Sequence, residues 1–126
     1  MKSFDLNRAP SEPAATPAPG VRAAVLLDQG QTKVRRIELD AGGAIPPCQM
    51  AEDAVFVVLR GLVTITSGAD EELVAAPGAV YVPGGATTRS LRAAEPSLVL
   101  AVLCRGARQD ALGQDASAQD PPARDA

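Results

Sequence analysis

The stretch AVFVVLRGLVTITSGAD, residues 54–70, decides the class of fold. Residues 54–60 are almost entirely apolar, which is typical of a strand buried on both faces. Gly61 permits a bend, and residues 62–66 continue as a strand rich in β-branched side chains. The tetrapeptide Ser67-Gly68-Ala69-Asp70 then has the composition of a hairpin loop. The stretch therefore predicts two consecutive strands and the turn that leads into a third.

The same alternation of apolar stretches and turns extends outward from residue 21 to residue 105. Turn clusters rich in Gly, Pro and Asp recur at intervals of roughly 8 to 12 residues, and no amphipathic helical period interrupts them. Pro46-Pro47 fixes an extended entry into Cys48. The predicted strands are residues 21–27, 32–39, 54–60, 62–66, 72–75, 79–82, 87–92 and 97–104. This succession predicts an all-β sandwich or barrel.

Both ends of the chain are poor in the residues that a core needs. Residues 1–20 are rich in Pro and Ala, so we expect a flexible arm that buries too little apolar surface to offset its ordering entropy. Residues 108–126 predict a flexible, solvated acidic tail, because their aspartates recur every five residues and fit neither a helix nor a strand. A docking peptide for a basic partner is the alternative for this tail. The predicted barrel domain is residues 21–107.

The charge distribution excludes several classes of partner. The net charge is −3, and residues 21–107 carry eight basic and nine acidic side chains. No basic cluster or aromatic platform is present, so no nucleic-acid partner is expected. No run of 18 apolar residues predicts a membrane span, and no apolar stretch follows Lys2 as in a secretory signal. The two cysteines then predict free thiols in a reducing cytoplasm.

The aromatic content limits how the core is built. Phe4 lies in the arm, and only Phe56 and Tyr81 lie in the barrel domain. The core must therefore consist mainly of Val, Leu, Ile and Ala. A domain of this size buries a limited share of its surface, so we expect a homodimer that buries more.

Two segments resemble the signatures of the cupin superfamily. The first runs from Gly43 through Cys48 and Met50 to Gly61, and matches the glycines of a pattern with a His-x-His pair and a Glu. The second runs from residue 77 to residue 88, with the order Gly, Pro-x-Gly and then a His position. Its interval from Gly78 to Pro83 is one residue shorter than usual. The resemblance implies a small double-stranded β-helix, or jelly-roll barrel, and suggests a homodimer.

The resemblance also implies that the metal-ligand positions have lost their ligands. The His-x-His positions fall on Cys48 and Met50, the Glu position falls on Ala54, and the second-signature His position falls on Thr88. The chain has no histidine, so a His/Glu-bound metal and the enzyme chemistry that depends on it are not expected. The absence of histidine also removes the commonest general base near neutral pH. We therefore favour a protein that is not an enzyme.

Several side chains are candidates for a binding site inside the barrel. Cys48 and Met50 are two residues apart on a predicted strand and therefore share a face. Arg92 shares its face with Thr88 and Ser90 by the same alternation, and an arginine there would bind an anion or lower the pKa of a thiol. The candidate ligand-binding residues are Cys48, Met50, Ala54, Phe56, Thr88 and Arg92.

Two functions follow from these positions. The first is a metal-free barrel without a cofactor that binds a small ligand or acts as a structural or regulatory module. The second is a soft-metal site of the Cu(I) type, or a redox-sensing site, built on Cys48 and Met50, with Cys104 as a further candidate metal ligand. An enzyme is one form of this second function. These three residues also fit the role of core fillers, because free Cys and Met are common in protein interiors. We favour the first function.

Overall fold

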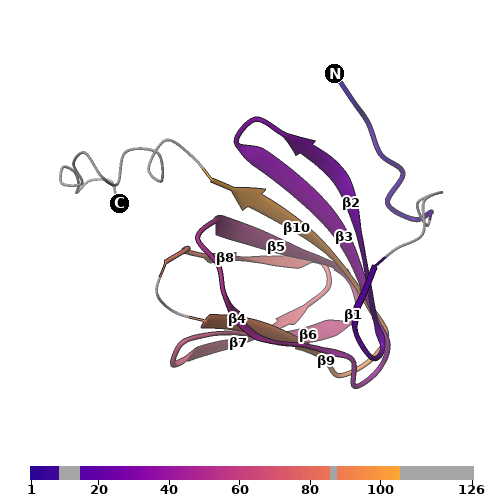
Figure 1. Cartoon of the computed structure of the whole chain (residues 1–126). Coiled ribbons are helices and arrows are strands. Elements are labelled where there is room, and N and C mark those ends of the chain that lie inside the picture. Colours follow the sequence, from indigo (N-terminus) through magenta and orange to yellow (C-terminus); the bar gives the residue numbers. More distant parts are fainter. Residues whose placement is uncertain (9–14, 86–87, 106–126) are drawn as a thin grey trace.

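The computed structural model describes residues 1–8, 15–85 and 88–105, and this part of the chain is built from β-strands (Figure 1). Ten strands follow one another: β1 Ala15–Ala18, β2 Val21–Gln29, β3 Thr32–Leu39, β4 Ala44–Gln49, β5 Asp53–Arg60, β6 Leu62–Ser67, β7 Asp70–Ala75, β8 Gly78–Val82, β9 Thr88–Ala93 and β10 Ser97–Cys104. In these ranges no helix is long and apolar enough to cross a membrane. The predicted all-β class is confirmed.

The strands form two sheets that face each other across the core (Figure 1). Sheet A has six strands in the order β1-β2-β3-β10-β5-β8, and sheet B has four in the order β4-β9-β6-β7. All neighbouring strands are antiparallel. Strands far apart in sequence, such as β3 and β10, lie side by side, as in a jelly roll. The predicted barrel is confirmed.

Two strands were not among those predicted. Strand β1 lies in the segment predicted to be a flexible arm, and it pairs with β2 because Pro19 and Gly20, with φ of 75° at Gly20, turn the chain back on itself. Strand β4 includes Pro46 and Pro47, where we predicted only an extended entry. Its pairing with β9 is irregular at these prolines, which have no N–H to donate. The predicted acidic tail lies outside the described residues.

Two N-terminal residues of the predicted arm also contact the barrel. The Nε atom of Arg36 donates a hydrogen bond of 3.1 Å to the backbone oxygen of Leu6. The guanidinium of Arg60 donates one of 3.5 Å to the side-chain oxygen of Asn7. These bonds hold residues 6 and 7 against the outer face of sheet A.

Small aliphatic side chains fill the space between the sheets. Phe56 is the one aromatic residue of the core cluster, as the composition implied. The other buried members are Val21, Ile37, Leu39, Ala54, Val58, Val63, Ile65, Val82, Leu91, Ala93, Val99, Ala101 and Leu103. Most come from alternate positions of their strands, because successive side chains of a strand point to opposite faces. A narrow interior of this kind excludes bulky groups from the middle of the barrel.

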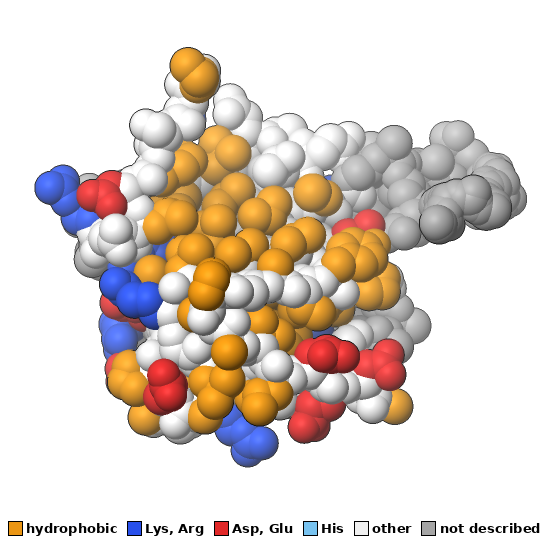
Figure 2. Space-filling view, turned by 180° about the vertical axis from the view of Figure 1, so that it is seen from behind, with side chains coloured by type: hydrophobic (Ala, Val, Ile, Leu, Met, Phe, Trp, Pro, Cys, Tyr) orange, Lys and Arg blue, Asp and Glu red, His pale blue; other side chains and the backbone are white. Residues whose placement is uncertain are grey.

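The outer face of sheet A is apolar as well. Val55 and Tyr81 are opposite each other on β5 and β8, and their exposed fractions are 37% and 58%. Figure 2 shows hydrophobic side chains gathered in one broad patch, with charged side chains toward its margins. The barrel therefore carries apolar surface on both sides of sheet A.

Gly61 joins β5 to β6 at a point where no side chain fits. Its φ of 90° lies in the left-handed region. A Cβ atom there would lie 2.5 Å from the carbonyl oxygen of Pro96 and would overlap the Ser97 hydroxyl. That hydroxyl accepts a hydrogen bond of 3.1 Å from the backbone N–H of Leu62 and donates one of 2.7 Å to the carbonyl of Glu95. The bend between the two sheets therefore depends on the absence of a side chain at residue 61.

We predict that Gly61→Ala destabilises the protein by more than about 2 kcal/mol, because backbone strain and steric overlap add. Gly30→Ala is the matched control, since Gly30 has φ of 60° but nothing within 4 Å of an added Cβ. We expect the control to lose about 1 kcal/mol from the left-handed backbone alone. Urea unfolding measures both free energies, and equal losses would contradict the steric role of Gly61.

Candidate ligand-binding site at the barrel mouth

Four polar or thiol side chains lie in one row across sheet B. Arg89 on β9 pairs with Cys48 on β4 and with Ser67 on β6, and Ser67 pairs with Asp70 on β7. Directly paired residues of an antiparallel sheet place their side chains on the same face. Two residues further along β9, Leu91 belongs to the core, so this row faces the barrel interior. The row forms the end of the interior, which we call the barrel mouth.

The guanidinium of Arg89 is buried at the mouth and is only partly satisfied. The residue is 3% exposed. Its Nη2 atom donates to the backbone oxygens of Met50, at 3.5 Å, and Glu52. Its Nε and Nη1 atoms are buried, and neither has a hydrogen-bond partner among the described residues. Buried donors without an acceptor cost free energy, so this guanidinium leaves unused capacity for an acceptor.

The charge of Arg89 is influenced by burial and by its neighbours. Burial lowers its pKa, because desolvation penalises the charged form. The nearby Glu52, Cys48, Asp53 and Tyr81 oppose this and raise the pKa of Arg89. Arginine retains its proton in proteins, so the group is a cation with a planar fork of N–H donors. The carboxylates of Glu52 and Asp53 weaken the positive field at the mouth without supplying partners to Nε or Nη1.

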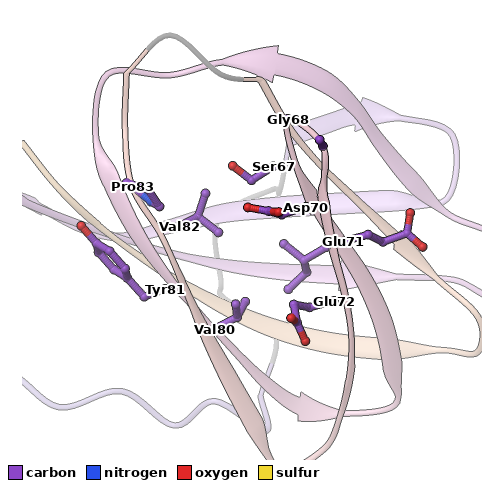
Figure 3. Close-up of a pocket in the computed structure, with 11 residues that line it drawn as sticks. Ser67, Gly68, Asp70, Glu71, Glu72, Val80, Tyr81, Val82 and Pro83 are labelled. Carbon is purple, nitrogen blue, oxygen red and sulfur yellow. The ribbon is translucent and has the colours of Figure 1, made fainter.

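A cavity of about 460 Å³ opens beside this row, between the β6–β7 hairpin and β8. Ser67 and Asp70 belong both to the row and to the lining of the cavity. In Figure 3 these two side chains lie across the cavity from Val82, whereas Glu71 and Tyr81 point away from it. The cavity therefore has apolar residues together with hydroxyl and carboxylate groups on β6 and β7. Arg89 is not among its lining residues, but it pairs with Ser67, which is.

The structure places Ala54 and Phe56 inside the barrel, as predicted. Both side chains are buried in the core cluster. Met50 is partly buried and packs against that cluster. Cys48 is exposed, but its pairing with Arg89 places it at the mouth. These four candidates therefore lie at or inside the barrel.

The predicted position of Thr88 and Arg92 inside the barrel was wrong. Both are exposed, and Arg92 pairs with Ala44 and Thr64 on the outer face of sheet B. The face that points inward carries Arg89 and Leu91 instead. The resemblance assigned the second-signature position by counting three residues on from Gly85, and the inward residue lies one position further on. A shift of one residue exchanges the two faces of a strand. Alternation from the apolar Leu91 would have identified Arg89.

The sulfur site of Cys48, Met50 and Cys104 is not assembled. Cys104 is exposed and pairs with Thr32 and Asp53, whereas its neighbour Leu103 is the residue that enters the core. Its side chain therefore lies on the outer face of sheet A, away from the mouth. The described part of the chain holds no group of three or more His, Cys, Asp or Glu side chains that could bind a metal ion.

The residues at the mouth do not fit the metal centre that the resemblance describes. Ala54 has no donor atom, Thr88 is exposed, and the inward position next to Thr88 is a cation. A buried guanidinium repels a metal ion, since like charges interact strongly where water is excluded. The same charge favours an anion.

We predict that both thiols react rapidly with a disulfide reagent in the folded protein, because Cys48 and Cys104 are exposed free cysteines. Cys48→Ser should shift the unfolding free energy by less than about 0.5 kcal/mol, as is usual for an exposed position. Thiol titration with and without urea checks the first expectation, and urea unfolding checks the second. If either thiol reacted only after unfolding, that cysteine would be buried in the folded protein, contrary to the structure.

The comparisons with known proteins concern the fold. No family model matches the sequence, and no curated protein matches it. The cupin domain of Schizosaccharomyces pombe Cnp3 is similar, with a TM-score of 0.73 and 16% identity over 88% of this chain and 79% of that domain. An RmlC-like cupin from Shewanella frigidimarina has a TM-score of 0.68 and 12% identity, over 79% of this chain and 87% of its own.

A third solved structure shows how widely proteins of this fold differ. The salicylate 1,2-dioxygenase of Pseudaminobacter salicylatoxidans has a TM-score of 0.64 and 18% identity, over 74% of this chain and 28% of its own. At such identities the likeness concerns the fold and does not carry an activity across. The chain therefore shares the cupin fold with these solved structures.

Proposed function

We propose that this protein is a metal-independent binding module. It holds a small anionic ligand at the barrel mouth, where the guanidinium of Arg89 binds the anion. The observation that carries this proposal is the buried guanidinium whose Nε and Nη1 atoms lack an acceptor among the described residues. A carboxylate or phosphate oxygen would supply the missing acceptor. The proposal narrows the small-ligand function that the sequence favoured.

The geometry of a guanidinium favours a planar or tetrahedral oxyanion over other ligands. Its donors form a rigid fork that matches two oxygens of one carboxylate or phosphate group. Arg89 uses only Nη2 for the backbone of Met50 and Glu52, so the side carrying Nε and Nη1 remains for a ligand. The negative charges of Glu52 and Asp53 weaken the positive electrostatic field of Arg89. Direct hydrogen bonds from Arg89, rather than long-range electrostatic attraction, would therefore hold the anion. The nearby cavity is lined by Ile65 and Val82 but also by Asp70, Glu71 and Glu72, so only an uncharged part of the ligand would extend into it.

Binding is better supported than catalysis. The chain has no histidine, and the carboxylate of Asp53 accepts a hydrogen bond of 2.8 Å from the backbone N–H of Gly84. That bond fixes the loop after β8 at the mouth. A non-enzymatic role and a cytoplasmic location, the latter predicted from the two cysteines, stay predictions.

We predict that small oxyanions stabilise the protein through Arg89. A ligand at ten times its Kd adds about 1.4 kcal/mol of stability, which raises the Tm of a domain of this size by several degrees. Acetate, citrate and inorganic phosphate, compared with chloride at constant ionic strength, are the probes in a thermal unfolding assay. At least one of them should raise the Tm of the wild type and lose that effect in Arg89→Met.

Arg92→Met is the matched control, because Arg92 is an exposed arginine on the outer face of the same strand. It should keep the full ligand effect. Arg89→Lys retains the charge but not the fork, so we expect a reduced effect. Should Arg89→Met fail to fold, Arg89→Lys carries the test. An equal Tm response in the wild type and in the Arg89 variant that folds would contradict the proposal.

We also predict that protein purified without a histidine tag under anaerobic conditions contains copper and zinc far below one equivalent, because Arg89 repels a cation at the mouth. Elemental analysis measures this content. Stoichiometric copper that is lost in Cys48→Ala would contradict metal independence and would favour the soft-metal alternative built on Cys48 and Met50.

A further inference from the structure

Four strands lie at the edges of the two sheets, and three of them carry residues that hinder pairing with another chain. Strands β1 and β8 end sheet A, and strands β4 and β7 end sheet B. Pro17 lies in β1, and Pro46 and Pro47 lie in β4, and a proline has no N–H to donate to a further strand. Strand β7 begins with the acidic residues 70–72. Strand β8 contains neither proline nor charge, so the edge that it does not share with β5 is open to another strand.

This open edge of β8 borders a groove. Strands β7 and β8 follow each other in the chain but belong to different sheets, and the cavity of about 460 Å³ lies between them. Cavities that hold ligands in proteins have volumes of about 300 to 1,000 Å³. Val80 and Val82 face the cavity from β8, because each pairs with a core residue of β5. The groove therefore offers an apolar wall beside backbone groups that have no neighbouring strand.

The opposite side of the groove is acidic. Asp70 and Glu72 face inward from β7, because Glu72 pairs with the core residue Ile65 and Asp70 lies two residues before it. Glu71 lies between them and points away from the cavity (Figure 3). All three carboxylates are exposed, and none of them forms an ion pair with a described residue. The groove therefore repels an anionic partner and attracts a cationic one.

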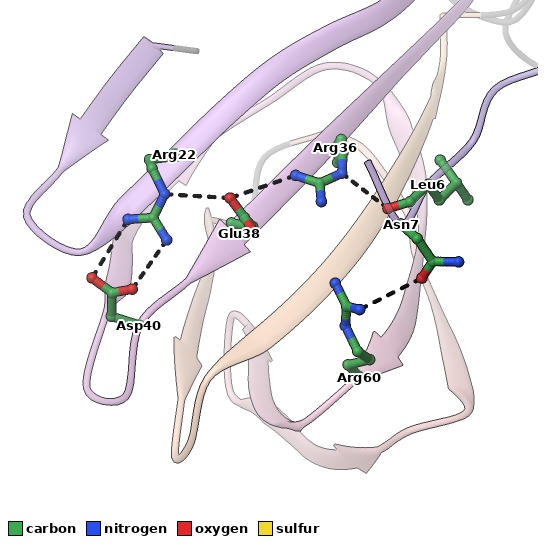
Figure 4. A network of polar contacts seen from close by, with 7 residues as sticks. All are labelled: Leu6, Asn7, Arg22, Arg36, Glu38, Asp40 and Arg60. Carbon is green, nitrogen blue, oxygen red and sulfur yellow. Dashed lines mark hydrogen bonds and ion pairs between the residues drawn. The ribbon is translucent and has the colours of Figure 1, made fainter. Parts of the chain in front are cut away.

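The acidic side chains of sheet A differ, because arginines neutralise them (Figure 4). Arg22 pairs with Glu38 at 3.3 Å and with Asp40 at 3.0 Å. Arg36 also pairs with Glu38, at 3.5 Å. Residues 70–72 have no such counter-ion in the part of the chain that the structure describes. Their negative charge is therefore available to a binding partner.

We propose that the open edge of β8 binds an extended peptide of another protein that carries lysine or arginine side chains, and that this peptide adds to sheet A as a further strand. Main-chain hydrogen bonds hold such a peptide, and its alternate side chains determine specificity. One alternate set faces Asp70 and Glu72 across the groove, and the other set lies on the side toward which Glu71 and Tyr81 point (Figure 3). The proposal does not depend on the anion site at Arg89.

Charge makes a different protein a better occupant of this groove than the chain itself. Pairing of β8 with β8 of a second copy would bring two sets of the acidic residues 70–72 together, and like charges at an interface oppose binding. The C-terminal residues 106–126 carry four aspartates and two arginines, so they are acidic as well. The acidic residues of β7 therefore protect the open edge against self-association and leave it accessible to a basic peptide.

Peptide titration tests the role of charge. The probe is a fluorescently labelled peptide of alternating Lys and Thr, titrated with the full chain at about 0.15 M salt and followed by anisotropy. We expect saturable binding, and none for the Glu-Thr peptide. Glu72→Lys should weaken binding on the order of tenfold, because repulsion replaces attraction. Glu95→Lys is the matched control, since Glu95 is exposed before β10 and changes the net charge equally; it should leave the affinity unchanged.

Backbone methylation of the peptide distinguishes strand addition from attraction of charge alone. In an added strand, alternate N–H groups of the peptide donate to β8 and the others point away. Of two peptides, N-methylated at every Lys or at every Thr, one should therefore lose binding and the other should keep it. Absence of binding to the wild type, equal binding of both methylated peptides, or equal weakening by Glu72→Lys and Glu95→Lys would overturn the proposal. Displacement of the labelled peptide by spermidine as readily as by unlabelled peptide would also overturn it, since a free polyamine has no strand backbone.

Discussion

Every inward-facing side chain of the two sheets has to fit one narrow interior, and the rest of the structure depends on this constraint. Successive residues of a strand point to opposite faces, so each strand commits every second residue to the core. The composition supplies Val, Leu, Ile and Ala for these positions, with Phe56 as the one aromatic member of the core cluster. Aliphatic side chains of this kind fill the space between the two sheets of the described part of the chain.

The same alternation determines what lies at the mouth. The inward row of β9 runs from Ala93 through Leu91 to Arg89, so a guanidinium occupies the position where the apolar core ends. Hydrogen bonds to the backbone of Met50 and Glu52 hold it there and fix the loop between β4 and β5. Burial of a charge with incomplete hydrogen bonding opposes stability, which makes an acceptor from outside energetically useful. The side chain best suited to bind a ligand therefore lies at the end of the barrel.

Part of this site was predictable, and the reasons are local. The apolar stretch of β5 predicted a strand buried on both faces, but only Ala54, Phe56 and Val58 are buried, while Val55 on the opposite face is 37% exposed. Arg89 was missed, since the His position of the cupin signature was counted from Gly85 and falls on Thr88, one residue before the side chain that points inward. Leu91 is the one bulky apolar side chain of β9, so the alternation of apolar and polar residues in this strand distinguishes its two faces only weakly. Strand β1 was missed as well, although Pro19 and Gly20 form a recognisable turn.

By itself, the sequence determined the all-β class, the bend at Gly61 and the aliphatic character of the core, because turn residues and alternation act within a few positions of the chain. Only the tertiary structure decided which face of β9 points inward, since strand register depends on partners far away in sequence. It also decided that Cys104 lies apart from Cys48, and that Leu6 and Asn7 meet Arg36 and Arg60. These contacts join residues that are far apart in sequence, so a local sequence pattern cannot predict them.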